Sequence, residues 1–173
     1  MLPDPLHPAV VHFPIVLAFL LPIFAAGALW AIRSGAEMRR AWAMPAVLAV
    51  ALTASGWLAL QTGEAQEERV EPVVGEAVLH EHEEAAERFL VLSGLVLVVA
   101  GVGFAGGTVG SAGRLLATVG SLAVVVAAFA VGDAGGELVY RHGAAQPYVT
   151  SAAAGTTRTA VPERDHSEEE EDR

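Results

Sequence analysis

The chain has 173 residues, of which 53% are apolar and only 17% are charged, and its mean hydropathy is +0.47. Its ten basic residues are all arginines, and most of its twenty acids lie in two blocks, 64–88 and 162–173. A soluble domain of this size spreads charge over its surface, so the composition argues against an ordinary globular fold. The absence of cysteine excludes disulfides, thiolate metal sites and covalently attached haem. The net charge of −10 argues against nucleic acid as a partner.

Four apolar stretches are long enough to cross a bilayer. A transmembrane helix needs about 20 apolar residues, and the chain has such stretches at 13–32, 41–63, 89–107 and 115–132. The sequence therefore predicts an all-α, four-span transmembrane helix bundle over residues 1–145, with the lipid bilayer as its first partner. We expect an acidic loop between the second and third spans, and third and fourth helices that extend beyond the membrane. Residues 146–173 are predicted to form a disordered acidic tail.

The arginines indicate an orientation in the membrane. The loop 33–40 holds three arginines, and the short Gly/Ser-rich turn 106–114 ends in a fourth. Basic loops favour the cytoplasmic side, so we expect both loops to face the cytoplasm of a plasma-membrane protein. Both termini and the acidic loop then lie on the extracytoplasmic side.

All six histidines belong to one side of the membrane. With four spans, the N-terminal segment, the loop between the second and third spans, and the C-terminal segment must share a side. These segments hold every histidine of the chain: His7, His12, His80, His82, His142 and His166. His166 lies in the acidic tail, where we expect it to be solvated. The clustering of the others is the main indication of a functional site.

Helical spacing separates His82 from His80. If a helix starts near Gly75, glutamates occupy most of the positions three and four residues away from His80. The same positions around His82 are apolar. The sequence therefore predicts that His82 faces the bundle and that His80 faces water.

The remaining histidines lie at helix ends. His12 begins the first span on an apolar face, and an ionisable group just inside a span is a functional-site hypothesis, with a hydrogen bond at headgroup level as the alternative. His7 precedes Pro8 and is interpreted first as a cap of the first helix. His142 ends the fourth helix, where the helix dipole favours a cation, so a structural and a functional role both stay open.

Several motifs make the chain recognisable. LHPAVVHFP at 6–14, EHEEAA at 81–86 and GGELVYRHG at 135–143 resemble the domain of unknown function 2231 family of small bacterial membrane proteins. The resemblance covers about residues 1–145 and implies a four-helix membrane fold. It also implies that His7, His12, His82 and His142 are family positions. It carries no established biochemistry, although some members are joined to cytochrome-like domains.

The first functional hypothesis is a b-type haem site that passes electrons to a redox partner at the outer face of the membrane. Such a haem needs one or two imidazoles from opposed helices, an apolar slot and cations near its propionates. His12 and His82 are the expected ligands, with His142 as a substitute and His7 as a further candidate. Arg88 and Arg141 lie where propionates would emerge.

The second hypothesis is a transition-metal site that combines the same histidines with carboxylates. Imidazole with carboxylate suits zinc, iron or copper. The expected ligands are His12, His82, His142, Glu83, Asp133 and Glu137. Against this hypothesis, no segment reads HExxH, and Glu76 and His80 are four residues apart rather than at the Glu-x-x-His spacing of di-iron sites in helix bundles.

The third hypothesis has no cofactor. The four spans would then form a membrane scaffold or an accessory subunit, and the histidines would make hydrogen bonds at the membrane interface. Hydrolytic activity gains no support, because the chain has no G-x-S-x-G motif and no arrangement of serine, histidine and aspartate suggests a triad. The sequence favours a protein that is not an enzyme and leaves these three functions open.

Overall fold

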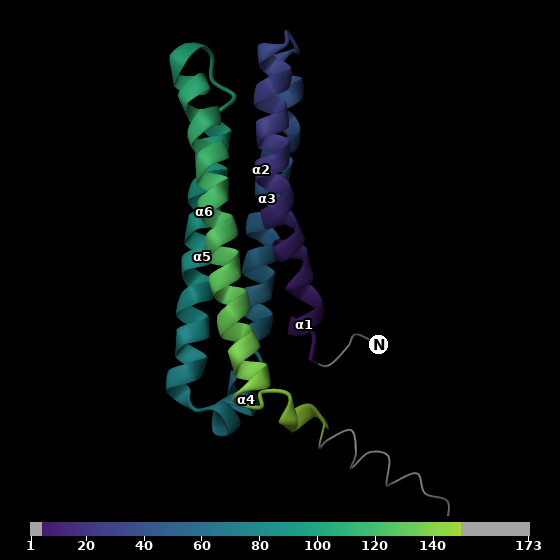
Figure 1. The fold of residues 1–173 in the computed structure, drawn as a ribbon, viewed down its shortest axis with the longest axis vertical. Helices are drawn as coiled ribbons and strands as arrows, with labels where there is room; N and C mark the ends of the chain where they lie inside the picture. The colour runs from purple at the N-terminus through teal and green to yellow at the C-terminus, as the bar shows by residue number, and fades with distance from the viewer. Residues whose placement is uncertain (1–4, 150–173) are drawn as a thin grey trace, which may run out of the picture.

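The computed structural model describes residues 5–149, which form a bundle of long helices (Figure 1). In chain order they are α1 (His7–Val10), α2 (His12–Arg33), α3 (Met38–Glu64), α4 (Glu67–Val74), α5 (Glu76–Val102) and α6 (Gly107–Tyr140). α1 and α2 follow one another directly and act as one span. Together with α3, α5 and α6 they give four helices that are long and apolar enough to cross a membrane. The predicted all-α, four-span membrane fold is confirmed.

Side-chain size divides the outside of the bundle from its interior. Large apolar side chains such as Phe13, Trp30 and Val126 are exposed on the outside, which is the face that lipid tails contact. Small residues such as Ala18 and Ala49 are buried where the helices meet. Association of helices within lipid depends on close packing rather than on hydrophobicity, and small side chains permit it.

The two helical hairpins repeat one another. α2 packs mainly against α3 and α6, and α5 packs mainly against the same two helices, so α2 and α5 stand diagonally opposite. Each buried position of α5 follows a buried position of α2 by 75 residues, and four buried positions of α6 follow buried positions of α3 by 72. The matched pairs include Pro14 with Phe89, Leu21 with Val96, Ala49 with Ser121, and Leu52 with Val124. Equivalent residues of the two hairpins therefore face the interior at the same level.

The turn between the third and fourth spans is shorter than predicted. The expected turn 106–114 lies almost wholly within α6, and α5 already ends at Val102. Close contact explains the difference, because a Cβ added to Gly110 would lie only 1.8 Å from the carbonyl oxygen of Ala105. The glycines of this segment thus allow a helix to pack against the end of α5, where the sequence suggested a loop.

The end of the bundle that carries His7 and His82 is more ordered than predicted. The acidic segment contains α4, and α5 begins next to Gly75, as expected. The apolar side chains of α4 pack against α6 in a small cluster of Val70, Val74 and Leu138. Tyr148 joins this cluster, and its hydroxyl group donates a hydrogen bond to the side-chain oxygen of Gln66 at 2.7 Å. Residues 146–149, at the start of the predicted tail, are helical and contact the bundle, while the rest of that tail, with His166, lies outside the described residues.

The native chain has no cysteine, which permits a direct test of topology. Ser34 and Glu68 are both exposed and lie at opposite ends of the bundle. In intact cells an impermeant thiol reagent should label a Glu68→Cys variant and leave a Ser34→Cys variant unlabelled. Labelling of both variants would contradict the four-span topology. Labelling of Ser34→Cys alone would show that the orientation in the membrane is the reverse of the predicted one.

Candidate functional site

His7 reaches from α1 to the neighbouring helix α3. Its Nδ1 atom lies 2.9 Å from the carbonyl oxygen of Ala59 and 3.3 Å from the hydroxyl oxygen of Thr62. A carbonyl oxygen can only accept, so Nδ1 carries the proton and Nε2 is left with a lone pair. The expected role of His7 as a helix cap is wrong, because Leu6 occupies the cap position and the imidazole bonds to another helix.

His82 occupies the equivalent place in the second hairpin. Like the other matched residues of α5, it follows its counterpart, His7, by 75 positions. Its ring interacts with the backbone of Val131 on α6, the counterpart of Ala59 on α3. Its Nδ1 atom is nevertheless buried and has no hydrogen-bond partner within residues 5–149. The predicted inward orientation of His82 is confirmed, as is the outward one of His80, whose side chain is 70% exposed.

The imidazoles of His7 and His82 meet at the end of the bundle where α1 begins. Their ring centroids are 6.4 Å apart and their planes are nearly perpendicular, at 88°. Each ring also lies against a glycine of an adjacent helix. A Cβ added to Gly63 of α3 would lie 3.2 Å from Cε1 of His7, and one added to Gly135 of α6 would lie 3.1 Å from Cε1 of His82. The site is thus two histidines from diagonal helices and two glycines from the helices between them.

His12, one of the two ligands that the haem hypothesis expects, does not face the interior of the bundle. Its side chain is exposed, as are those of Phe13 and Val16 beside it. His12 follows His7 by five residues, which is a rotation of about 140° around a helix, so the two cannot face the same side. The apolar face on which His12 lies is the outward side of the helix, since membrane helices bury their small residues.

The other predicted ligands stay apart from the histidine pair. Arg88 pairs with Glu84 at 2.8 Å and Arg141 pairs with Glu137 at 2.7 Å, both as exposed contacts within one helix. The side chain of Glu83 lies 3.9 Å from His80 and that of Asp133 is exposed. His142 is half-buried beyond the end of α6. The part of the chain that the structure describes contains no group of three or more His, Cys, Asp or Glu side chains able to hold a metal ion.

Sequence reasoning missed Gly63 and Gly135, and it placed the wrong histidine beside His82. A seven-residue repeat along the first span carries the missing information. His7, Pro14, Leu21 and Ala28 recur at this interval, and the last three are buried. A repeat of seven marks the contact seam of packed helices, so the seam includes His7 and leaves out His12.

Comparison with known proteins agrees with this architecture. A family model described as a predicted membrane protein, DUF2231, matches residues 3–147. No curated protein and no solved structure matches the chain. The family match spans most of the sequence and confirms the resemblance carried by the motifs. The chain is a member of the DUF2231 family of predicted membrane proteins.

Proposed function

We propose that His7 and His82 bind the iron of a b-type haem between them, and that the protein transfers electrons at the extracytoplasmic end of the bundle. The observation that carries the proposal is the meeting of two imidazoles from diagonally opposite helices, with ring centroids 6.4 Å apart. A metal bound by two opposed imidazole nitrogens at about 2 Å each sets the ring centroids roughly 6 Å apart. The spacing suits one iron with two axial ligands.

The hydrogen bonding of His7 supports a ligand role. Histidines that bind metals usually donate the N–H of one ring nitrogen to a backbone carbonyl or a carboxylate, which fixes the tautomer and the ring orientation. The Nδ1 atom of His7 does so to the carbonyl of Ala59. Its Nε2 atom is then available as the axial ligand. His82, with a buried Nδ1 atom that lacks a partner, gains a reason for its burial if its ring also binds the iron.

Gly63 and Gly135 affect how much space a haem would have between the helices. A haem held by His7 and His82 would need space between α3 and α6, which carry Gly63 and Gly135 beside the two rings. These glycines now touch the imidazoles, and two open hollows of the described residues lie elsewhere, beside Arg114 and between α2 and α3. Binding of haem therefore requires α3 and α6 to move apart at the outer end. The absence of side chains on both glycines lowers the cost of that movement.

A single transition-metal ion is the second candidate, and the compact packing favours it. An ion held by the two imidazoles would need less space between α3 and α6 than a haem would. Imidazole ligands suit copper, zinc and iron. Two nitrogens alone make a weak site for most of these metals, so a third ligand from solvent or from a partner would be required.

A visible spectrum of the detergent-purified full chain separates these functions. A haem protein should show a Soret band, with a sharp α band after dithionite reduction, and one haem per chain. The matched control is His12→Ala, which removes an exposed histidine and should keep the spectrum. A bound metal without a Soret band would support the second candidate. If the protein binds neither haem nor metal, even after incubation with each, the cofactor-free scaffold is the remaining function.

A further inference from the structure

The end of the bundle opposite the histidines contains an open hollow of about 570 Å³. It lies where the turn between α5 and α6 approaches the end of α2 and the start of α3. Gly106, Gly107, Thr108, Ser111 and Arg114 form one wall of it. The hollow therefore combines backbone N–H groups, two hydroxyl groups and one guanidinium group.

Arg114 is the charged group of this hollow, and only 7% of the residue is exposed. Its Nη1 atom donates to the carbonyl oxygen of Gly103 and its Nη2 atom to the hydroxyl oxygen of Ser111, at 3.1 Å. Within residues 5–149 no carboxylate forms an ion pair with it. A buried charge without a counter-ion is costly, so an anion in the hollow would stabilise this arrangement.

The N-terminus of α6 adds backbone N–H donors, which also favour a negatively charged ligand. Gly106 occupies the cap position and offers no side-chain hydrogen bond to the helix. The first N–H groups of a helix have no partner within it, and their dipole favours negative charge. Gly107 and Thr108 bring these groups to the wall of the hollow. A helix N-terminus and a buried arginine thus face one space.

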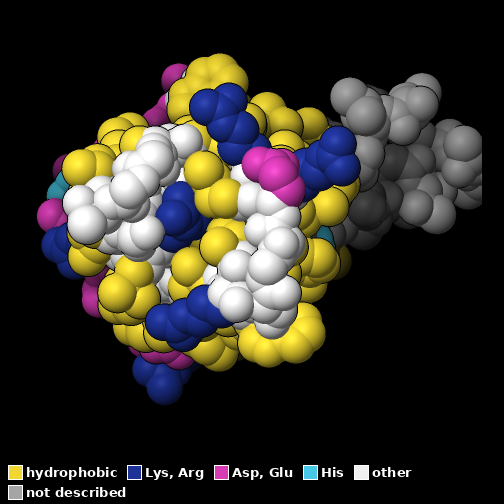
Figure 2. Space-filling view, turned by 90° about the horizontal axis from the view of Figure 1, so that it is seen from above, with side chains coloured by type: hydrophobic (Ala, Val, Ile, Leu, Met, Phe, Trp, Pro, Cys, Tyr) yellow, Lys and Arg dark blue, Asp and Glu magenta, His cyan; other side chains and the backbone are white. Residues whose placement is uncertain are grey.

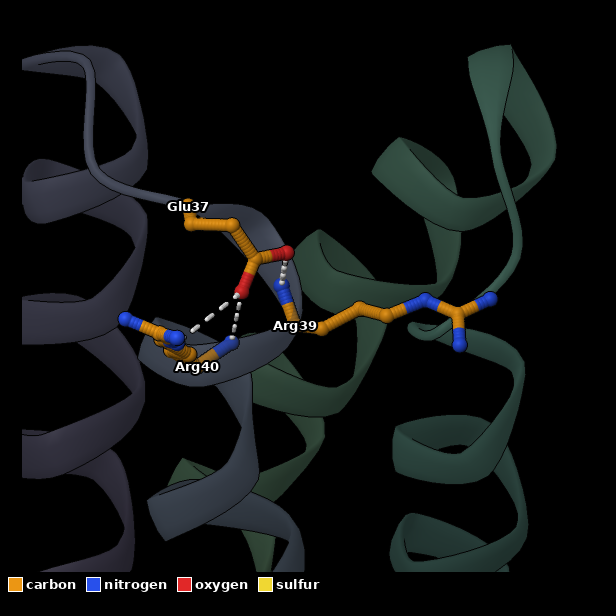
Figure 3. A network of polar contacts seen from close by, with 3 residues as sticks. All are labelled: Glu37, Arg39 and Arg40. Carbon is orange, nitrogen blue, oxygen red and sulfur yellow. Dashed lines mark hydrogen bonds and ion pairs between the residues drawn. The ribbon is translucent and has the colours of Figure 1, made fainter.

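The surroundings are basic as well. Figure 2 views this end of the molecule and shows arginine side chains around and within the face. The side chain of Arg39 extends toward the turn between α5 and α6 (Figure 3). Glu37, the one acid of the loop 33–40, accepts hydrogen bonds from the backbone N–H groups of Arg39 and Arg40 at 2.9 Å, which lowers the pKa of Glu37. Its carboxylate is occupied in capping α3 and does not neutralise Arg114.

We propose that this hollow binds a phosphate group, supplied by the headgroup of an anionic phospholipid. The hollow lies at the end of the spans, at the level where headgroups meet the protein, and basic pockets between transmembrane helices on the cytoplasmic side suit anionic headgroups. The hollow lies at the opposite end of the bundle from His7 and His82. The proposal of a phosphate site therefore does not depend on whether the histidines bind haem.

Native mass spectrometry of the full chain in detergent tests the proposal. With added phosphatidylglycerol and phosphatidylcholine, the wild type should retain phosphatidylglycerol preferentially. Arg114→Gln and Thr108→Glu should each weaken that retention at least tenfold. Arg40→Gln is the matched control, since the Arg40 side chain is 91% exposed, and it should bind as the wild type does.

The two site variants guard against a loss of folding. Thr108 is exposed, and a glutamate in the first turn of a helix is favourable, so Thr108→Glu should fold while its charge repels the phosphate. Inorganic phosphate is then added to the lipid-bound protein. If it displaces the lipid from the wild type but does not displace the residual lipid from the variants, free phosphate is a second ligand of the hollow. Equal retention of the two lipids by the wild type would overturn the proposal. Unchanged retention by Thr108→Glu would overturn it too.

Discussion

Replacing His82 with alanine should remove the bound haem or metal, and His80→Ala should leave it in place. The two residues are identical in chemistry and two positions apart, but only His82 faces His7, whereas the His80 side chain is 70% exposed. Loss of one of two axial ligands should reduce the haem content per chain by at least tenfold, as measured by the reduced absorption spectrum. His7→Ala should have the same effect, because the iron needs both rings.

Thermal unfolding adds a second measurement to the same variants. A bound group stabilises the folded state by mass action, so His82→Ala should lower the melting temperature of loaded protein. In cofactor-free protein the buried Nδ1 atom of His82 lacks a partner, and its removal should leave the melting temperature unchanged or slightly raised. Equal effects of His80→Ala and His82→Ala on haem content would refute the assignment of the ligands.

The membrane fold was predictable because each span is a continuous apolar run of the required length. The inward orientation of His82 was predictable for a different reason. It lies in the part of α5 that is flanked by glutamates, where an apolar stripe contrasts with a charged one and marks the packed face. Where a helix has one polar and one apolar face, helical spacing is sufficient to predict which side chains face the interior.

The orientation of His12 was not predictable in that way, since the first span is apolar all round. Only residue size distinguishes its two faces, and the small side chains of Ala18 and Ala25 mark the interior. The prediction of where α6 begins was wrong for a related reason. Its glycines resemble a turn in the sequence, yet Gly110 and Gly113 are buried in helix contacts. A glycine allows either outcome, and the tertiary contact decides.

Replacing Gly110 with alanine should be among the most destabilising single-methyl changes in the chain. The added Cβ would lie 1.8 Å from the carbonyl oxygen of Ala105 and 2.6 Å from its carbonyl carbon. Both are backbone atoms, so a side-chain rotation cannot relieve the overlap, and the α5–α6 turn must open. Overpacking in a core costs about 1–3 kcal/mol, and we expect a loss of roughly 3 kcal/mol in the free energy of unfolding here, because the backbone itself has to move.

Gly101→Ala is the control for this experiment. Gly101 is a helical glycine of α5 with nothing within 4 Å of an added Cβ, and alanine is favoured over glycine in a helix by about 1 kcal/mol. Thermal unfolding in detergent should therefore show an unchanged or raised melting temperature for Gly101→Ala and a large decrease for Gly110→Ala. If Gly110→Ala were as stable as the wild type, α6 could not begin at Gly107 in its close contact with the end of α5. The hollow beside Arg114 would then lose its wall, because the same turn forms both.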